Sequence, residues 1–308
     1  MGGETRVVAG TGKRLRHHLE LAGVKALIAL PALFPLKISV KLGGALGVLA
    51  FDLFRVRRRV SLDNLSRAFG DRCSARERER IARRSYVNFA KSMVEFASLK
   101  RLTKLDYEKL VRVEGVENLE RALAAGRGVV AVTGHFGSWE LLGAAIVARG
   151  FSADFLVGEQ SNSLVNDAMN DLRRAAGIGV IERGIAARGV FDSLKRRRIV
   201  ALLADQDARR AGVFVDFFGT PASTFQGPAQ FAFRAGCPIL CTFIVRQRDE
   251  SHVAHFLPPV FPRTEGERDA EIKRLTAEHV KSLEEFASRH PDHYFWAHKR
   301  WKTKPPAS

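Results

Sequence analysis

His135 and Glu140 are the two residues whose types and spacing best suit acid–base chemistry in this sequence. The β-branched run Val129–Val132 predicts a short buried strand, Thr133–Gly137 predicts the turn at its end, and a helix is expected to follow from Ser138. Ligands of open α/β sheets bind outside the carboxyl ends of strands, where this turn falls. An imidazole there can serve as a general base near neutral pH.

The spacing alone proves little. With nine His and 33 acidic residues in 308, chance gives roughly one His-x4-acid pair, and a second one, His279 and Glu284, is present. Those two fall within one predicted helix, where five residues turn through about 500° and the side chains point apart. His135 instead precedes its helix and can fold back over the first turn. The alternative is a structural histidine in a tight turn, with Glu140 stabilised by the helix dipole.

The segment Thr133–Leu142 (TGHFGSWELL) resembles the His-x4-Asp/Glu box of the glycerolipid acyltransferase superfamily. The form HFGSWE resembles that of the late acyltransferases of lipid A biosynthesis, of the lauroyl/myristoyl type, and of their glycolipid-acylating relatives. From about Arg57 to the end, the likeness continues through DQD at Asp205–Asp207, GVFVDFFGTPASTFQGPA at Gly212–Ala229 and YFWAHKRWK at Tyr294–Lys302. One departure is the segment VGEQSNSLVND, which lacks the Arg-Pro pair often found there.

This resemblance implies transfer of a fatty acyl chain from a thioester, on acyl carrier protein or CoA, to a hydroxyl of a lipid A precursor or related glycolipid. It implies His135 as the base, oriented by Glu140, and neither a metal nor another cofactor. Since Ser138 is not in a G-x-S-x-G motif, we expect direct attack by the acceptor. Oxyanion donors are expected among the backbone amides of 134–138 or from an arginine.

Other functions stay open as alternatives. They are acylation of a different phospho-glycolipid, hydrolysis of acyl thioesters with water as acceptor, and nucleic-acid binding. The last is disfavoured because the basic residues are spread along the chain and no nucleic-acid-binding module is recognisable. The absence of G-x-x-x-x-G-K-[ST] and G-x-G-x-x-G argues against a nucleotide ligand.

Further substrate-binding candidates follow predicted strands or lie on predicted helices. Arg183 follows strand 180–181 and the DQD loop follows strand 199–204, so both should emerge at the sheet edge that carries His135. Arginine side chains suit the phosphates of a glycolipid. Two carboxylates without further oxygen ligands make a poor Mg²⁺ or Ca²⁺ cage. For each candidate a solvated side chain or plain connecting loop is the alternative; the set is Arg80 and Asn88 (by resemblance only), Arg173, Arg183, Asp205, Gln206, Asp207 and Thr224.

The alternation of strand and helix patterns predicts an α/β fold with a mostly parallel central sheet and helices on both faces, like that of glycerolipid acyltransferases. We expect 219–227 to be a polar connecting loop and 252–257 an edge-like strand. The tail 294–304 is expected to be either a last strand, with Trp296 and Trp301 on opposite faces, or an aromatic and basic surface strip. The other expected strands are 129–132, 153–157, 180–181, 199–204, 213–218 and 239–245.

The net charge of +17 and pI near 10.4 indicate an anionic partner, such as an acidic protein or membrane face. The hydrophobic content of 46% is ample for a core. Three cysteines cannot close a disulfide set and show no zinc spacing, so we expect reduced thiols in a cytosolic compartment.

Residues 1–56 combine many basic residues with two apolar stretches, 21–36 and 42–54. Neither stretch reaches the roughly 20 unbroken apolar residues that cross a bilayer, and a cleavable signal peptide fits poorly. We expect 1–56 to be a membrane-associating helical region and 57–308 the acyltransferase domain. The protein would lie on the cytoplasmic face of the bacterial inner membrane, peripheral or anchored by one helix. The alternative is a helical subdomain packed on the core.

Overall fold

A seven-stranded sheet forms the centre of the computed structural model, which describes residues 16–23, 25–26, 29, 33–158, 161–182, 186–263 and 265–306. Its strand order is β1-β9-β8-β2-β5-β3-β4. Every neighbouring pair is parallel except β8 and β9, so the predicted mostly parallel sheet is confirmed. The strands are β1 (Val111–Glu114), β2 (Val129–Thr133), β3 (Ala153–Val157), β4 (Gly179–Glu182), β5 (Ile199–Leu203), β8 (Ile239–Arg246) and β9 (His252–Phe256).

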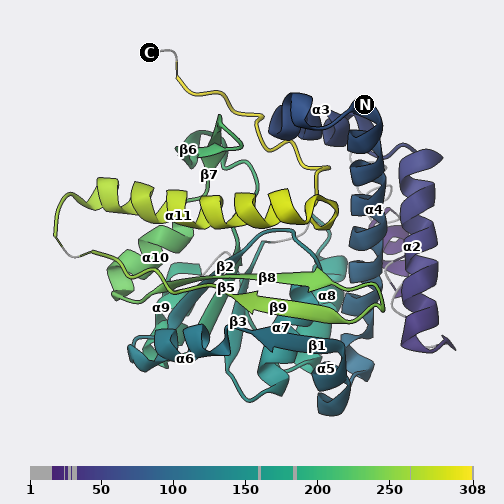
Figure 1. Cartoon of the computed structure of the whole chain (residues 1–308). Coiled ribbons are helices and arrows are strands. Elements are labelled where there is room, and N and C mark those ends of the chain that lie inside the picture. The colour runs from purple at the N-terminus through teal and green to yellow at the C-terminus, as the bar shows by residue number, and fades with distance from the viewer. Residues whose placement is uncertain are drawn as a thin grey trace, which may run out of the picture.

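Helices cover both faces of this sheet (Figure 1). Side chains alternate across the central strand β2, so Val130 and Val132 pack with α10 (Gly227–Ala235) and α11 (Arg268–Arg289) on one side. Val129 and Ala131 face the opposite side, with α7 (Trp139–Ala148). Burial on both faces explains why β2 is a continuous apolar run.

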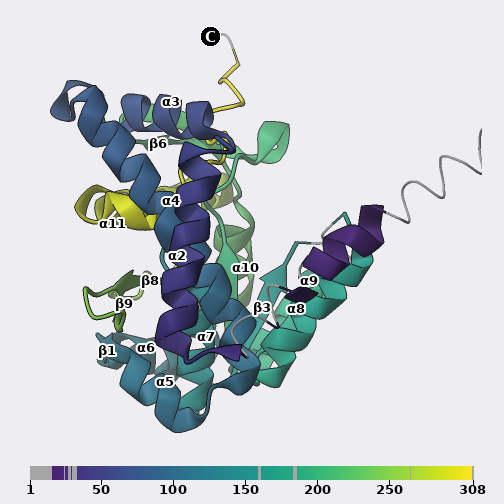
Figure 2. The same cartoon turned by 90° about the vertical axis from the view of Figure 1, so that its right-hand side faces the viewer.

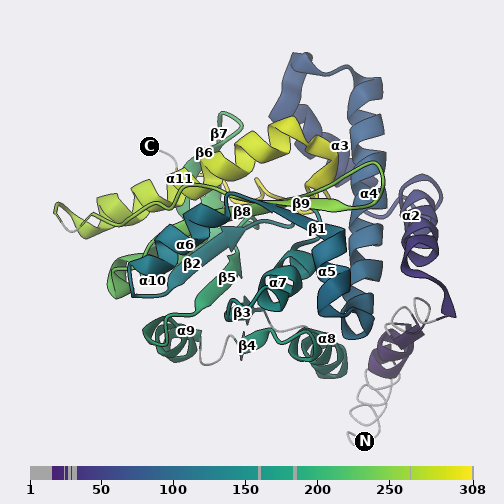
Figure 3. The same cartoon turned by 60° about the horizontal axis from the view of Figure 1, so that its bottom comes forward.

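The remaining α-helices flank this core. The longest, α4 (Ala75–Ser98), begins with a capping box in which Ser74 and Glu77 satisfy each other's backbone amides. The helix α2 (Leu36–Asp52) lies alongside α4 on the outside of the molecule (Figures 2 and 3). The others are α3 (Arg58–Phe69), α5 (Lys104–Leu110), α6 (Val116–Ala124), α8 (Ser163–Ala175) and α9 (Ala186–Lys195).

Two strand predictions are wrong at the margins of the fold. No strand was predicted at β1, because its four-residue pattern VRVE is too short to stand out. Since β1 pairs with β9, the predicted edge-like strand 252–257 lies inside the sheet. The predicted loop 219–227 instead contains β7 (Thr220–Thr224), which pairs antiparallel with β6 (Val213–Phe217). The polar composition of 219–227 predicted a loop, but five of its residues pair with β6 in this two-stranded ribbon.

The C-terminal tail forms neither of the predicted alternatives. Trp296 and Trp301 are only 1% and 9% exposed and belong to the same hydrophobic cluster, and the segment is not a regular strand. Tyr294 makes one isolated bridge with Phe136, and the Phe295 amide donates to the carbonyl of His135 at 2.9 Å. The tail therefore packs as an irregular segment beneath the turn that carries His135.

The helix α2 exposes a row of large apolar residues, while its buried side contains Val40 and Phe51 together with small residues. Its buried side includes Gly43, Gly44 and Gly47; a Cβ on Gly47 would lie 2.5 Å from the carbonyl oxygen of Tyr86 on α4. Only glycine permits this close approach. The outward side is an apolar ridge, defined here as Ile38, Leu42, Leu46, Leu49 and Leu53, each 41–66% exposed.

None of the helices in the described ranges is both long and apolar enough to span a bilayer. The cysteine prediction is confirmed for Cys237 and Cys241, which are buried and unpaired, whereas Cys73 is partly exposed. Burial raises the pKa of the Cys237 and Cys241 thiols to about 12, so both stay protonated.

Candidate active site

The turn that follows β2 carries His135 at the carboxyl edge of the sheet, as predicted. Its backbone is fixed from two sides: the Gly137 amide donates to the carbonyl of His293 at 2.9 Å, and Ser92 Oγ of α4 donates to the carbonyl of Gly137 at 3.1 Å. Gly137 has φ +58°, and a Cβ there would lie 2.0 Å from the carbonyl oxygen of Ile244. The turn thus requires glycine at this position and is rigid on both sides of the imidazole.

Asp205 orients the ring of His135. Its Oδ1 lies 2.8 Å from His135 Nδ1, and its Oδ2 accepts the His135 backbone N–H at 3.0 Å. Asp205 reaches the ring because it follows β5, the neighbour of β2 in the sheet. His135 Nε2 faces the amide of Gln206 at 3.5 Å and is the nitrogen left for chemistry.

The prediction that Glu140 orients His135 is wrong, since Asp205 occupies Nδ1. Glu140 lies in the first turn of α7 and points towards α8, where Arg173 Nε donates to its two carboxylate oxygens at 3.1 and 3.0 Å. Arg173 also donates to Asn170 Oδ1 at 2.7 Å, and its guanidinium lies over the ring of Phe96. The Glu140 and Arg173 side chains are 5% and 10% exposed, so they form a buried ion pair between α7 and α8.

Electrostatics favour a charged pair at His135 and Asp205. Burial acts to lower the pKa of His135, but the charge and hydrogen bond of Asp205, with a contribution from Glu140, raise it above its ordinary value. Burial acts to raise the pKa of Asp205, but the charge and hydrogen bonds of His135 hold it below its ordinary value. Asp205 therefore remains ionised and stabilises an imidazolium at His135.

A cavity of about 520 Å³ opens beside this pair. Its polar lining includes His135, Glu140, Arg173 and Gln206, and Trp139 packs edge-on against the imidazole with 5.0 Å between ring centroids. The greater part of the lining is apolar and comes from the face of the sheet that α7 covers, together with residues of α7, α8 and α10. A mostly apolar wall of this kind suits a long hydrocarbon chain.

Four other predicted site residues, Arg80, Asn88, Asp207 and Thr224, are not part of this cavity lining. Asp207 Oδ2 accepts hydrogen bonds from the amide and hydroxyl of Thr303, and the Thr224 hydroxyl accepts one from the buried Arg300; both hold the tail in place. Arg80 is exposed on α4. Asn88 donates to the carbonyl of Asp292 at 2.8 Å. Arg183 lies outside the described residues.

The second His-x4-acid pair behaves as the helical geometry predicts. His279 is buried in α11, where burial lowers its pKa to about 3. Glu284 instead accepts the backbone N–H of Phe218. The part of the chain that the structure describes contains no group of three or more His, Cys, Asp or Glu side chains arranged to hold a metal ion.

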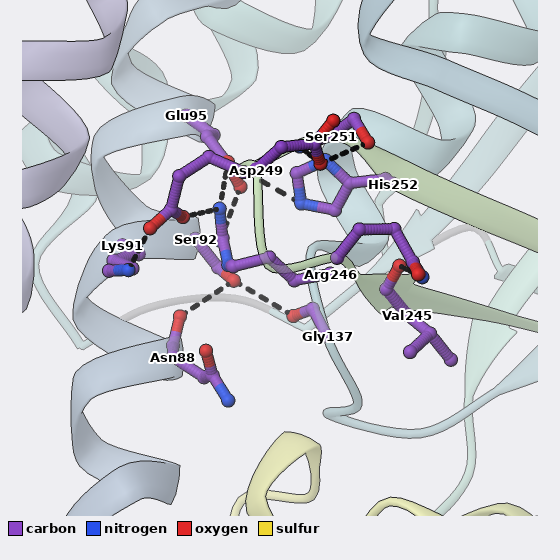
Figure 4. A network of polar contacts seen from close by, with 12 residues as sticks. Asn88, Lys91, Ser92, Glu95, Gly137, Val245, Arg246, Asp249, Ser251 and His252 are labelled. Atoms are coloured by element: carbon purple, nitrogen blue, oxygen red, sulfur yellow. Dashed lines mark hydrogen bonds and ion pairs between the residues drawn. The ribbon is translucent and has the colours of Figure 1, made fainter.

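A buried polar network supports the turn from behind (Figure 4). Arg246 of β8 donates to Glu95 of α4, with 2.8 Å between Nη2 and Oε2, and also reaches Glu250 at 3.2 Å, which pairs with Lys91. His252 lies 3.4 Å from Glu95, and burial lowers its pKa to about 4, which leaves it neutral. These contacts fix α4 against β8 close to Ser92, which holds the turn.

The fold and the site, an imidazole backed by a buried carboxylate at the mouth of an apolar cavity, are those expected of an acyltransferase. The chain belongs to the bacterial lipid A biosynthesis acyltransferase family, whose model matches residues 11–303. The resemblance found in the sequence is thereby confirmed, and the protein is an enzyme of the acyltransferase class.

Named relatives agree on the chemistry and differ in the acceptor. The chain is 27% identical over 277 residues to lipid A biosynthesis palmitoleoyltransferase of Escherichia coli, covering 88% of this chain and 87% of that protein. It is 25% identical over 277 residues to the E. coli lipid A biosynthesis lauroyltransferase, covering 88% and 87%. It is 32% identical over 151 residues to phosphatidylinositol mannoside acyltransferase of Mycobacterium tuberculosis, covering 46% and 48%. Together these relatives support acyl transfer to a glycolipid.

Proposed function

We propose that this enzyme moves a fatty acyl chain from an acyl thioester to a hydroxyl of a lipid A precursor or a closely related glycolipid, with His135 as general base. The observation that carries this proposal is the contact between His135 Nδ1 and Asp205 at the mouth of the apolar cavity. It leaves Nε2, which faces the Gln206 amide at 3.5 Å, as the ring nitrogen that can accept a proton beside space for an acyl chain.

The chemical step follows from this geometry. The acceptor hydroxyl gives its proton to His135 Nε2 as its oxygen forms a bond to the thioester carbonyl carbon. When the tetrahedral intermediate collapses, the C–S bond breaks and the imidazolium returns the proton to the departing thiolate. Asp205 fixes the tautomer with hydrogen on Nδ1 and stabilises the imidazolium, as the third member of a hydrolase triad does.

Only some backbone amides of the turn are available to stabilise the oxyanion of the tetrahedral intermediate. The amides of His135, Phe136 and Gly137 already donate to Asp205, Gly134 and His293. The remaining candidates from the predicted stretch are the amides of Gly134 and Ser138. A backbone amide is well suited to this role because it is fixed before the charge develops.

The relatives favour a lipid A precursor as the acceptor. The lipid A enzymes align along nearly the whole chain, whereas the mannoside acyltransferase aligns along about half of it. Arg173, which we expected to bind acceptor phosphates, forms an ion pair with Glu140. We therefore assign it a structural role in the site and not a role in phosphate binding. For the donor, the charge of +17 suits an acidic acyl carrier protein and also the phosphates of CoA, so both stay candidates.

The apolar ridge of α2 supports membrane association. A surface helix normally turns its large apolar side chains inwards, whereas α2 turns Leu42, Leu46 and Leu49 to solvent. Lys37 and Lys41 flank the ridge and are exposed, which suits anionic head groups. We propose that this ridge lies in the cytoplasmic leaflet of the inner membrane and that the enzyme is peripheral.

Lipid analysis tests the function directly. A bacterial host that lacks its own late acyltransferase is given this gene, and its lipids are analysed by mass spectrometry; a mass gain of one acyl chain on lipid A is expected. The matched control is His135→Ala, which should lose about 10²–10⁴-fold in turnover while keeping the wild-type thermal unfolding midpoint. Wild-type transfer by purified His135→Ala protein would refute the assignment.

Purified components separate the remaining alternatives. Acyl carrier protein thioesters and CoA thioesters are compared as donors, and free fatty acid is measured with and without lipid acceptor. A mass gain on another phospho-glycolipid would revise the proposed acceptor and leave the acyltransferase assignment unchanged. Fatty acid release that does not depend on acceptor would show a thioesterase instead.

A further inference from the structure

The wall of the cavity beside His135 is layered. Alternate residues of β2, β5 and β3 face α7, and the strand register places them side by side. Leu203 and Ile199, at the two ends of this wall on β5, are four residues and therefore about 13 Å apart. From the His135 end inwards the layers are Thr133 with Leu203, then Ala131, Ala201 and Phe155, then Ile199 with Ala153.

The middle layer is where the cavity can be closed. Ala131 and Ala201 are direct neighbours across β2 and β5, and their small side chains leave the passage open at this depth. Phe155, next to Ala201 on β3, bounds the passage on one side. Its ring lies against Gly143 of α7, where a Cβ would be only 2.2 Å from the ring's Cζ. The ring therefore spans the gap between sheet and helix as a side wall.

We infer that the donor's acyl chain lies in this passage, with its carbonyl carbon beside His135, and that Ala201 and Ala131 set how long a chain is accepted. The inference rests on the proposed function. A larger side chain at Ala201 would fill the passage halfway down, so a long chain would no longer bring its thioester to His135. A short chain ends above that layer and would still fit.

Chain-length preference is the property to measure. Ala201→Leu closes the passage at the middle layer, and Ala131→Leu does so from the neighbouring strand, so the failure of one variant to fold leaves the other. Ala201→Ser, which keeps the volume nearly unchanged, is the matched control. Ile199→Ala enlarges the deepest layer and should move the preference to longer chains. Thermal unfolding midpoints identify the variants that are folded.

Two readouts keep the inference separate from the proposed function. The first is displacement of a bound fluorescent fatty acid by saturated fatty acids of graded length, which needs no acceptor. The second is turnover with acyl carrier protein thioesters of the same lengths. We expect the Leu variants to lose long chains by on the order of tenfold or more while retaining short ones, the discrimination that a misfitting apolar group produces.

The outcomes are distinct. Equal losses for all chain lengths in a folded Leu variant, or no change at all, would overturn the role of Ala201 and Ala131 and leave the proposed function standing. Chain-length-dependent fatty acid binding without acyl transfer by the wild-type enzyme would refute the proposed function and the donor role of the passage together. A shift to shorter chains in Ala201→Leu, absent in Ala201→Ser, supports the inference.

Discussion

Asp205 holds His135 at two points, the ring Nδ1 at 2.8 Å and the backbone N–H at 3.0 Å. Both points are hydrogen-bond donors when the ring carries its proton on Nδ1, and the carboxylate accepts from both. The arrangement therefore fixes the tautomer as well as the position of the imidazole. It also identifies Asp205, 70 residues from His135, as the positioning residue of the site.

Asp205→Asn should lower turnover by about 10²–10⁴-fold. Asparagine offers one acceptor and one donor where two acceptors are needed. If its oxygen takes the His135 backbone N–H, its amide faces Nδ1 and moves the ring proton to Nε2, which can then no longer act as a base. Steady-state turnover checks this prediction, with Asp207→Asn, a change in the same loop but away from the cavity, as control. Equal effects of the two substitutions would contradict it.

The pH dependence of turnover should report the same pair. The base must be neutral, and Asp205 raises the pKa of His135, so kcat/KM should rise with pH through a value above the ordinary histidine pKa of about 6.5. In Asp205→Asn the rise of the residual kcat/KM should occur at lower pH, because no carboxylate is left to raise the pKa of His135. The measurement is a pH profile of kcat/KM for both proteins. If kcat/KM of the variant rises over the same pH range as that of the wild type, Asp205 is not what raises the pKa of His135.

Both pKa shifts stabilise the folded state, but their contributions depend on pH in opposite directions. The raised pKa of His135 stabilises the fold fully below the unfolded value, and this stabilisation is lost as pH rises through the folded value. The lowered pKa of Asp205 stabilises the fold above its unfolded value, and this is lost as pH falls through the folded value. The pair should therefore stabilise most between the two unfolded values, about pH 4 to 6.5. Urea unfolding of wild type and His135→Ala across pH 4–9 tests this; a constant difference would contradict it.

Substitution of Glu140 or Arg173 should mainly lower the free energy of unfolding. Removing one member of a buried ion pair leaves the other charge uncompensated, which costs about 3–5 kcal/mol. We expect Glu140→Gln and Arg173→Met each to lower the free energy of unfolding by about that amount, and the double variant to lose less than the sum. Denaturant titration of the four proteins gives the coupling. Strict additivity would mean that the two side chains do not act as a pair.

The apolar ridge of α2 should control binding to vesicles. Leu46→Glu places a charge in the ridge and removes an apolar side chain worth about 1.5–3 kcal/mol of burial, so affinity for anionic lipid vesicles should fall at least tenfold. Leu105→Glu is the matched control, since Leu105 is 56% exposed on α5. Co-sedimentation with vesicles is the measurement. Equal losses in the two variants would exclude a specific role for the ridge.

The local features of the site were predictable from the sequence, but its long-range partners were not. The strand, turn and helix around His135 follow from hydrophobic periodicity within a single stretch, and the observed β2 and α7 match that prediction closely. The role of Asp205 depends on β5 lying beside β2, and sheet order is set by packing across the whole chain. Glu140 was misassigned because its partner Arg173 lies 33 residues further along the chain on α8, and the packing of α7 on α4, α5 and the sheet, which turns the carboxylate towards Arg173, cannot be read from the local sequence.

The glycine face of α2 bears on the membrane docking that we propose for the opposite side of that helix. At Gly43, Gly44 and Gly47 the helix α2 contributes no side chain to the contact with α4, so its backbone packs directly against side chains and backbone of α4. The same α4 grips the catalytic turn through Ser92. In the docking that we propose, α2 and α4 would therefore connect the leaflet to the turn that carries His135, and the fold itself would set the height at which a lipid's hydroxyl meets the base.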